Sequence, residues 1–189
     1  MRIIGGKFRS RVLTSFDGEA VRPTADRVKE SLFNILALRF QGARVLDLFS
    51  GSGALGLESI SRGAREVVFN DKSKDSIAIL KKNLRTLKIE ENKETKVFNL
   101  DADVYLDFAK EPFDLIFIDP PYALDVGVKA VEKIAKKGLL AKGGVLVFER
   151  DCSFDGDVDG LEKYDERKYG RTVLTFFRNA NHENCNSRR

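Results

Sequence analysis

The feature of the sequence most specific for chemistry is Asp119-Pro120-Pro121-Tyr122, which follows the apolar run of residues 113–118. Asp119 and the Pro120 carbonyl can each accept an N–H of an amino group and so orient the lone pair of its nitrogen. The two prolines stiffen the turn, and Tyr122 offers a face on which a nucleic-acid base can stack. These four catalytic candidates suit chemistry on an amino nitrogen whose lone pair is delocalised into a ring.

A second group of residues surrounds a glycine-rich turn. Gly51, Gly53 and Gly56 have the spacing of nucleotide-binding loops, and Asp71 lies twenty residues after Gly51. Glycines allow close approach of a ligand to the backbone, and a carboxylate after the second strand can accept hydrogen bonds from ribose hydroxyls. This pattern alone does not separate a dinucleotide from another ribonucleoside cofactor. Asp47, four residues before the turn, would repel a pyrophosphate and suits a ligand with a sulfonium and an ammonium group.

Alternating strands and helices must position both groups. The hydrophobic periodicity predicts strands at residues 44–49, 66–71, 96–100, 113–118 and 145–149, followed by a hairpin over residues 164–177. It predicts helices at residues 24–38, from the glycine turn to residue 61, and at residues 73–88, 104–110 and 126–137. Thr24 is the expected N-cap of the first helix.

Repeated strand–helix units of this size predict an α/β fold. We expect a mostly parallel seven-stranded sheet with helices on both faces and an antiparallel C-terminal hairpin. Residues 1–43 are interpreted as a short basic β extension and a helix packed on the core. Residues 44–178 are the expected cofactor-binding domain, and residues 179–189 a disordered tail.

Composition narrows the function classes further. No apolar run approaches the roughly 18 to 20 residues that span a bilayer, and no signal peptide is recognisable, so we expect a cytoplasmic protein with no membrane partner. Two cysteines and one histidine cannot build a disulfide framework or a Cys/His metal cluster. We therefore expect no metal, and chemistry that uses carboxylates, backbone groups and aromatic rings.

The net charge of +4 is unevenly distributed. Residues 1–44 hold nine Lys and Arg against four Asp and Glu, whereas the remaining 145 residues have a net charge of −1. Within the first thirteen residues there is no acid, and the cations are Arg2, Lys7, Arg9 and Arg11. This segment is interpreted either as an arm that binds nucleic-acid phosphates or as an ordinary solvated basic terminus.

The run from Asp47 to Gly53 resembles the first motif of the Rossmann-like methyltransferases, and Asp119–Tyr122 resembles the fourth motif of the amino-directed ones. The first resemblance implies S-adenosylmethionine as cofactor and these contacts to it: Asp47, Phe49, Ser50, Gly51, Gly53, Asp71, Asp101 and Ala102. Asn70 is an alternative to Asp71, and Asp103 to Asp101, while the turn after the third strand could simply hold a helix cap.

Nearly the whole chain resembles one family, the bacterial small-subunit (16S) ribosomal RNA guanine-N2 methyltransferases. The resemblance is carried by residues 1–6, 22–34, 46–56, 119–122 and 168–170. It implies direct in-line methylation of guanine N2 by a monomer acting on small-subunit RNA in a partly assembled particle. The expected RNA contacts are Arg2, Lys7, Arg9, Arg11 and Arg22. The motifs themselves also admit an adenine-N6 or cytosine-N4 methyltransferase acting on DNA or RNA, or a non-catalytic RNA-binding assembly factor.

Overall fold

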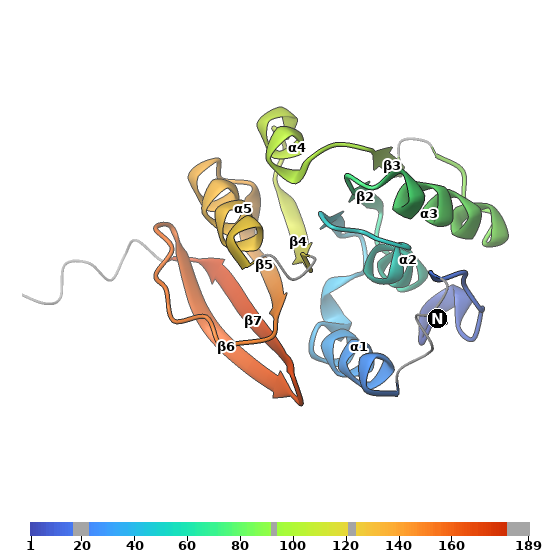
Figure 1. The fold of residues 1–189 in the computed structure, drawn as a ribbon, viewed down its shortest axis with the longest axis horizontal. Coiled ribbons are helices and arrows are strands. Elements are labelled where there is room, and N and C mark those ends of the chain that lie inside the picture. Colours follow the sequence, from blue (N-terminus) through green and yellow to red (C-terminus); the bar gives the residue numbers. More distant parts are fainter. Residues whose placement is uncertain (17–22, 92–93, 121–123, 181–189) are drawn as a thin grey trace, which may run out of the picture.

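A seven-stranded mixed sheet in the order β3-β2-β1-β4-β5-β7-β6 forms the centre of the molecule (Figure 1). The computed structural model describes residues 1–16, 23–91, 94–120 and 124–180. Strands β3, β2, β1, β4 and β5 are parallel, and β7 pairs antiparallel with both β5 and β6. The expected α/β fold with an antiparallel C-terminal hairpin is therefore confirmed.

The bounds of the elements follow the predicted alternation. The strands are β1 (Arg44–Asp47), β2 (Glu66–Asn70), β3 (Thr95–Phe98), β4 (Phe113–Ile118), β5 (Leu140–Arg150), β6 (Leu161–Tyr169) and β7 (Thr172–Asn179). The α-helices are α1 (Pro23–Ile35), α2 (Ala54–Ser61), α3 (Lys74–Thr86), α4 (Ala102–Phe108) and α5 (Leu124–Lys136), with short 3-10 turns η1 (Gly6–Phe8) and η2 (Ala37–Arg39).

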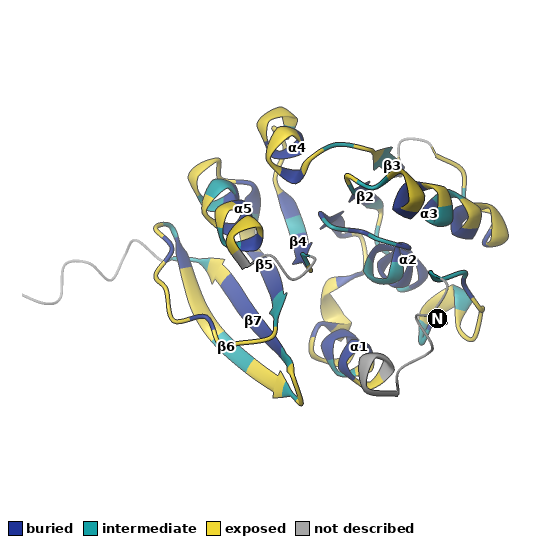
Figure 2. Cartoon of the chain, viewed as in Figure 1, coloured by how far each residue is buried: buried dark blue, intermediate teal, exposed yellow. Residues whose placement is uncertain are grey.

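Each face of the sheet is covered by its own layer of helices. Apolar residues of α1, α2 and α3 pack with one face of the strands, and those of α4 and α5 pack with the other. Figure 2 shows the resulting pattern, in which the central strands are buried and the helices expose their outer sides. Parallel strands that are covered on both faces must be apolar nearly throughout, as the run of residues 113–118 is.

The N-terminal segment has the antiparallel pairing of the expected β extension at one bridge only. Residues 1–14 form a loop closed by a single bridge between Arg2 and Val12 and tightened by the turn η1. Ile3 and Leu13 are buried in the same core as α1, α2 and α3. Gly6 adopts a positive φ of 72° at the turn, and this conformation favours a loop over a continuous strand.

The first helix and the end of the chain also differ from expectation. Helix α1 begins at Pro23, so Thr24 lies inside the helix and is not its N-cap; proline at the first helical position explains the earlier start. Leu38, expected on the apolar face of this helix, is 98% exposed in η2. Asn179, assigned to the tail, still belongs to β7 and donates hydrogen bonds to the Leu140 and Ala141 carbonyls.

Within the described residues, no helix has the length and apolar content needed to cross a membrane.

Candidate active site

Three of the predicted site carboxylates lie at the carboxyl edge of the parallel sheet. Asp47 is the last residue of β1, Asp71 follows β2 and Asp119 follows β4. Since β2, β1 and β4 are neighbours in the sheet, their ends converge on one side of the molecule. This edge is where open parallel sheets bind their ligands.

The glycine turn between β1 and α2 has the conformation that its sequence predicts. Gly51 and Gly53 have φ values of +51° and +88°, in the left-handed region that side chains disfavour. A Cβ on Gly53 would lie 2.5 Å from Leu80 Cδ1, whereas a Cβ on Gly51 would meet no atom within 4 Å. Gly53 is thus required by packing against α3, and Gly51 leaves open space beside the turn.

Asp47 is buried, and its Oδ2 accepts the N–H of Gly56 at 2.8 Å in the first turn of α2. Burial raises the pKa of Asp47 to about 7, against the lowering effect of this hydrogen bond. The negative charges of Asp119 and Asp71 raise the pKa further, and Lys29 lowers it. A cationic ligand at this edge would offset the repulsion among the carboxylates.

Asn70 and Asp71, the two candidates for the ribose contact, have different partners in the structure. Asn70 is buried, and its Nδ2 donates to the carbonyls of Leu48 and Leu100, which ties β2 to the two neighbouring strand ends. Asp71 is partly exposed, and its Oδ2 accepts the N–H of Gly51 at 2.8 Å. Asp71 is therefore the carboxylate that faces the glycine turn, while Asn70 holds the strands.

Asp101 and Ala102 lie at the start of α4, where the helix-cap alternative applies. Asp101 is the N-cap, and its side chain accepts the N–H of Asp103. Ala102 is buried at the first position of the helix. Asp103 itself is exposed and is paired with Lys133 of α5. Both Asp101 and Ala102 retain their predicted place after β3, but the carboxylate of Asp101 is engaged in capping.

Two further predicted cofactor contacts flank the glycines. Phe49 is partly buried against the core formed with α4 and α5. Ser50 is buried, and its hydroxyl has no hydrogen-bond partner in the part of the chain that the structure describes. An unpaired buried hydroxyl is costly, so Ser50 would gain from a ligand with a polar group at this position.

The structure describes half of the catalytic motif. Asp119 is exposed and Pro120 is partly buried, whereas Pro121 and Tyr122 lie outside the described residues. Sequence analysis missed Glu149, which is near the end of β5, the strand next to β4. Burial, followed by the negative charge of Asp119, raises the pKa of Glu149 to about 8. The signal that the sequence offered for this residue was a glutamate near the end of a predicted buried strand.

The basic N-terminal loop is docked through its backbone. Glu58 of α2 is fully buried and accepts the N–H groups of Ile4 and Gly5, each at 2.8 Å. Glu58 also pairs with Lys29 at 3.2 Å and with Arg62 at 2.9 Å. The sequence analysis did not identify this network, because nothing in a helical pattern distinguishes a buried glutamate from a solvated one.

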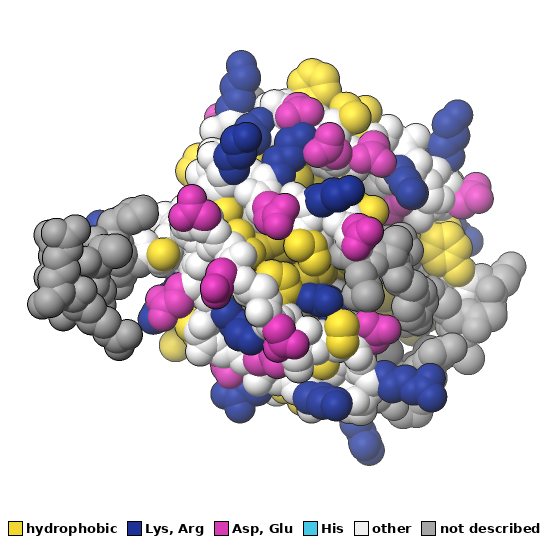
Figure 3. Space-filling model, turned by 60° about the vertical axis from the view of Figure 1, so that its left-hand side comes forward, with side chains coloured by type: hydrophobic (Ala, Val, Ile, Leu, Met, Phe, Trp, Pro, Cys, Tyr) yellow, Lys and Arg dark blue, Asp and Glu magenta, His cyan; other side chains and the backbone are white. Residues whose placement is uncertain are grey.

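The four cations of this loop point away from the core. Their side chains are exposed, and none forms an ion pair with another described residue: Arg2, Lys7, Arg9 and Arg11. By contrast, the face drawn in Figure 3 carries acidic and basic side chains interspersed with one another. Arg22, the fifth predicted RNA contact, lies outside the described residues.

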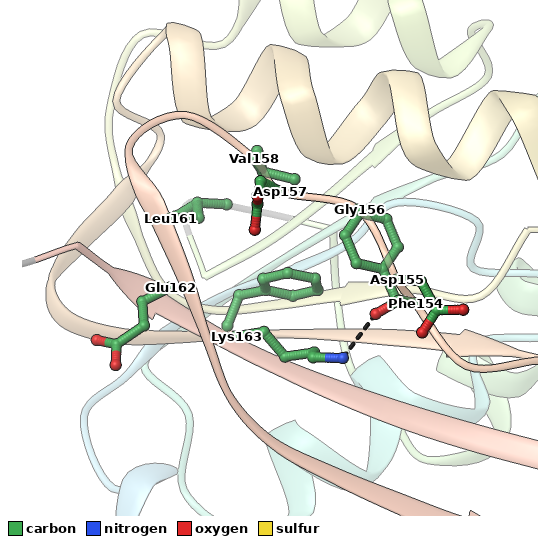
Figure 4. Close-up of a pocket in the computed structure, with 9 residues that line it drawn as sticks. Phe154, Asp155, Gly156, Asp157, Val158, Leu161, Glu162 and Lys163 are labelled. Carbon is green, nitrogen blue, oxygen red and sulfur yellow. Dashed lines mark hydrogen bonds between the residues drawn. The ribbon is translucent and has the colours of Figure 1, made fainter.

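A separate cavity of about 470 Å³ lies between residues 154–158 and the start of β6 (Figure 4). Lys163 reaches across it and donates a hydrogen bond to the carbonyl of Phe154. None of the predicted site residues lines this cavity. Among the described residues there is also no group of His, Cys, Asp and Glu that could hold a metal ion.

Comparisons with known proteins show the family and the fold of this chain. The family model described as "Conserved hypothetical protein 95" matches residues 1–178. The chain is 38% identical to "Ribosomal RNA small subunit methyltransferase D" of Haemophilus influenzae, over 80% of this chain and 79% of that protein. A solved structure of a hypothetical protein from Thermus thermophilus is 33% identical, has a TM-score of 0.77, and is matched over 93% of this chain and 98% of that one.

A more distant structure shares the fold alone. It is the Thermus thermophilus 16S rRNA N2 G1207 methyltransferase in complex with AdoMet and guanosine. It is 24% identical and has a TM-score of 0.66, with the match covering 87% of this chain and 45% of that chain.

Proposed function

The chain belongs to the family described as conserved hypothetical protein 95, together with proteins named ribosomal RNA small subunit methyltransferase D, and we propose that it transfers a methyl group from S-adenosylmethionine to N2 of a guanine in small-subunit ribosomal RNA. One observation carries this proposal: the glycine turn and Asp119 lie at the carboxyl edge of two neighbouring parallel strands, β1 and β4. A bound nucleoside cofactor and an acceptor amine can therefore meet there.

The residues at this edge fit S-adenosylmethionine. The open space beside Gly51 and the unpaired Ser50 hydroxyl can accommodate its polar parts. Asp71 is placed to accept hydrogen bonds from the ribose hydroxyls, and Asp47 to attract the amino-acid end. The mutual repulsion of the carboxylates favours a ligand with positive charge. When bound, the cofactor supplies an electrophilic methyl group on a positively charged sulfur.

Asp119 and the Pro120 carbonyl are proposed to hold the acceptor amine. Each accepts one N–H of the amino group, which directs the nitrogen lone pair at the methyl carbon. S-adenosylmethionine, when bound, would supply that carbon, and its sulfur would keep the electrons of the broken carbon–sulfur bond as the new bond to nitrogen forms. The surplus proton on nitrogen then passes to Asp119 and on to solvent. Positioning and electrostatics supply the rate acceleration in such a step.

Identification of the methylated nucleoside tests the proposed function. Small-subunit RNA is incubated with the protein and labelled S-adenosylmethionine, then digested and separated by mass spectrometry. We expect N2-methylguanosine. Labelled N6-methyladenosine would instead identify adenine as the substrate base, and labelled N4-methylcytidine would identify cytosine. Absence of label on every RNA tested would favour the non-catalytic assembly factor.

We propose that the RNA is presented in a partly assembled ribosomal particle and that the protein acts as a monomer. The described residues form one α/β unit around a single sheet. For this unit to reach its target, the base must already be accessible in its loop or be flipped out of it. Parallel assays with naked 16S RNA and with reconstitution intermediates are expected to show faster methylation of the intermediates. Equal rates of methylation on naked RNA and on the intermediates would show that a partly assembled particle is not required.

Replacement of Asp71 by alanine is expected to weaken S-adenosylmethionine binding by about 1.5–3 kcal/mol, the usual contribution of a charge-assisted hydrogen bond. Calorimetric titration measures the change. The neighbouring variant Asn70→Ala is the matched comparison, because Asn70 bonds to strand carbonyls. Asn70→Ala should lower thermal stability with a smaller effect on cofactor affinity; the reverse pattern would assign the ribose contact to Asn70.

Replacement of the four loop cations by alanine is expected to weaken RNA binding and to flatten its salt dependence. The variant carries Arg2→Ala, Lys7→Ala, Arg9→Ala and Arg11→Ala. Each lost phosphate contact removes about 0.7–0.9 from the slope of log K against log salt concentration. Lys142→Ala is the control, since Lys142 is an exposed cation near the start of β5, outside the N-terminal loop. Equal slopes for the wild type and the quadruple variant would mean that the loop is an ordinary solvated terminus.

A further inference from the structure

Glu149 is the cross-strand neighbour of Asp119. The last paired residues of β4 and β5 are Ile118 and Phe148, so Asp119 and Glu149 each follow by one residue on adjacent parallel strands. Adjacent strands lie about 4.8 Å apart. The two carboxylates are therefore side by side at the edge of the sheet where the acceptor amine is proposed to bind.

Both side chains project from the same face of the sheet. Side chains alternate along a strand, and Phe117 and Val147, two residues earlier on each strand, both belong to the core that includes α1. Asp47 is level with Phe117 on the next strand, β1. Asp119 and Glu149 thus extend past a layer of apolar side chains into the region beside Asp47, and this placement limits the solvation of Glu149.

No described cation compensates the charge of Glu149. From β4 it is faced by Asp119, and from β7 its paired residue is the apolar Leu174. The next residue of β5, Arg150, projects to the opposite face, where its guanidinium lies over the rings of Phe148 and Phe154.

On α1, the helix that covers this face, Lys29 is paired with Glu58, and Arg27 and Glu30 are exposed. Burial and a neighbouring negative charge both favour the neutral form of a carboxyl group, so ionising the second carboxyl of this pair is costly. Asp119 is exposed whereas Glu149 is partly buried, so Glu149 is the carboxyl that keeps the proton. Burial and the negative charge of Asp119 accordingly raise the pKa of Glu149 to about 8.

We propose that Glu149 is a positioning residue for Asp119: at neutral pH it is protonated and donates its carboxyl hydrogen to one oxygen of Asp119. The other oxygen of Asp119 is then directed at the acceptor amine, and the pair carries one negative charge. This role rests on the proposed function of Asp119. Above the pH at which Glu149 ionises, the hydrogen bond is replaced by repulsion, and Asp119 loses its fixed orientation.

Three variants test this role through the pH dependence of methyl transfer. Glu149→Gln retains a hydrogen-bond donor without a titratable group, Glu149→Ala removes the donor, and Glu132→Gln changes an exposed glutamate on α5 as a control. The rate constant kcat and the KM values for cofactor and RNA are measured between about pH 6 and pH 9.5, a range that brackets the ionisation of Glu149.

We expect the wild type and Glu132→Gln to lose activity above about pH 8. Glu149→Gln should retain kcat at pH 7 within about threefold and show no such loss, while Glu149→Ala should lose about tenfold or more in kcat at pH 7 with little change in either KM. Equal loss in Glu149→Gln and Glu149→Ala, or an alkaline decline that persists in Glu149→Gln, would overturn the proposal.

A second measurement is independent of methyl transfer and so separates this inference from the proposed function. Because the pKa of Glu149 is raised in the folded protein, its contribution to stability is full at low pH and is lost as the pH rises toward 8. The melting temperature of Glu149→Gln minus that of the wild type should therefore increase between pH 5 and pH 8 and then level off. A constant difference would show that Glu149 is ionised and would overturn the proposal, even if the wild type methylates RNA.

Discussion

Replacement of Asp119 by alanine is expected to lower kcat for methyl transfer about 10²–10³-fold, the effect of removing one preorganised partner of a reacting group. Asp119 follows β4, one residue beyond the last pair with β5, and is the residue proposed to hold the acceptor amine rather than the cofactor. With one acceptor lost, the amine is held only by the Pro120 carbonyl, and its lone pair is no longer aligned with the methyl carbon.

Cofactor affinity distinguishes this effect from general damage to the site. The Kd for S-adenosylmethionine should change little in Asp119→Ala, and it can be measured by calorimetry on the same preparation. Asp125→Ala, which removes an exposed carboxylate in the first turn of α5, is the matched control and should keep both kcat and Kd. Turnover by Asp119→Ala close to that of the wild type would exclude Asp119 from the reaction.

The largest effect on stability is expected from Glu58→Ala, which should lower the free energy of unfolding by about 3–5 kcal/mol. Glu58 is fully buried and accepts two backbone N–H groups of the N-terminal loop. Its loss leaves the ammonium of Lys29, which is itself 8% exposed, without this carboxylate. Denaturant unfolding monitored by circular dichroism measures the change.

Two further variants show whether the buried contacts of Glu58 are responsible for this loss of stability. Lys29→Met in the Glu58→Ala background removes the buried ammonium that has lost this carboxylate, so the double variant should be more stable than Glu58→Ala. Glu162→Ala removes one partner of an exposed ion pair with Arg178 and should have a much smaller effect. A loss in Glu58→Ala no greater than in Glu162→Ala would contradict the network's role in holding the loop.

Several elements follow from local sequence pattern alone. The run 113–118 predicts β4 with its observed bounds, because its apolar residues stop at residue 118 and Pro120-Pro121 cannot continue a central strand. The glycine turn is equally local, since the positive φ values of Gly51 and Gly53 are required by the turn itself. The order of strands and helices and the antiparallel hairpin at the C-terminus also follow from periodicity and turn residues.

Other features depend on contacts between distant segments. Asn70 and Asp71 are adjacent and similar in the sequence, and only the partners of Asn70 in two other strand ends separate their roles. The N-terminal loop was expected as a short β extension, but the N–H groups of Ile4 and Gly5 bond to Glu58, more than fifty residues away. Local pattern does not contain these partners.

The sequence by itself determined the fold class, the glycine turn and the position of the Asp119 motif at a strand end, because each depends on residues close together in the chain. The tertiary structure decided which carboxylates face one another. Asp119 and Glu149 are thirty residues apart and become neighbours only through the register of β4 and β5. The packing of apolar side chains along the full length of both strands sets that register, and burial at its end gives Glu149 a pKa that no local pattern predicts.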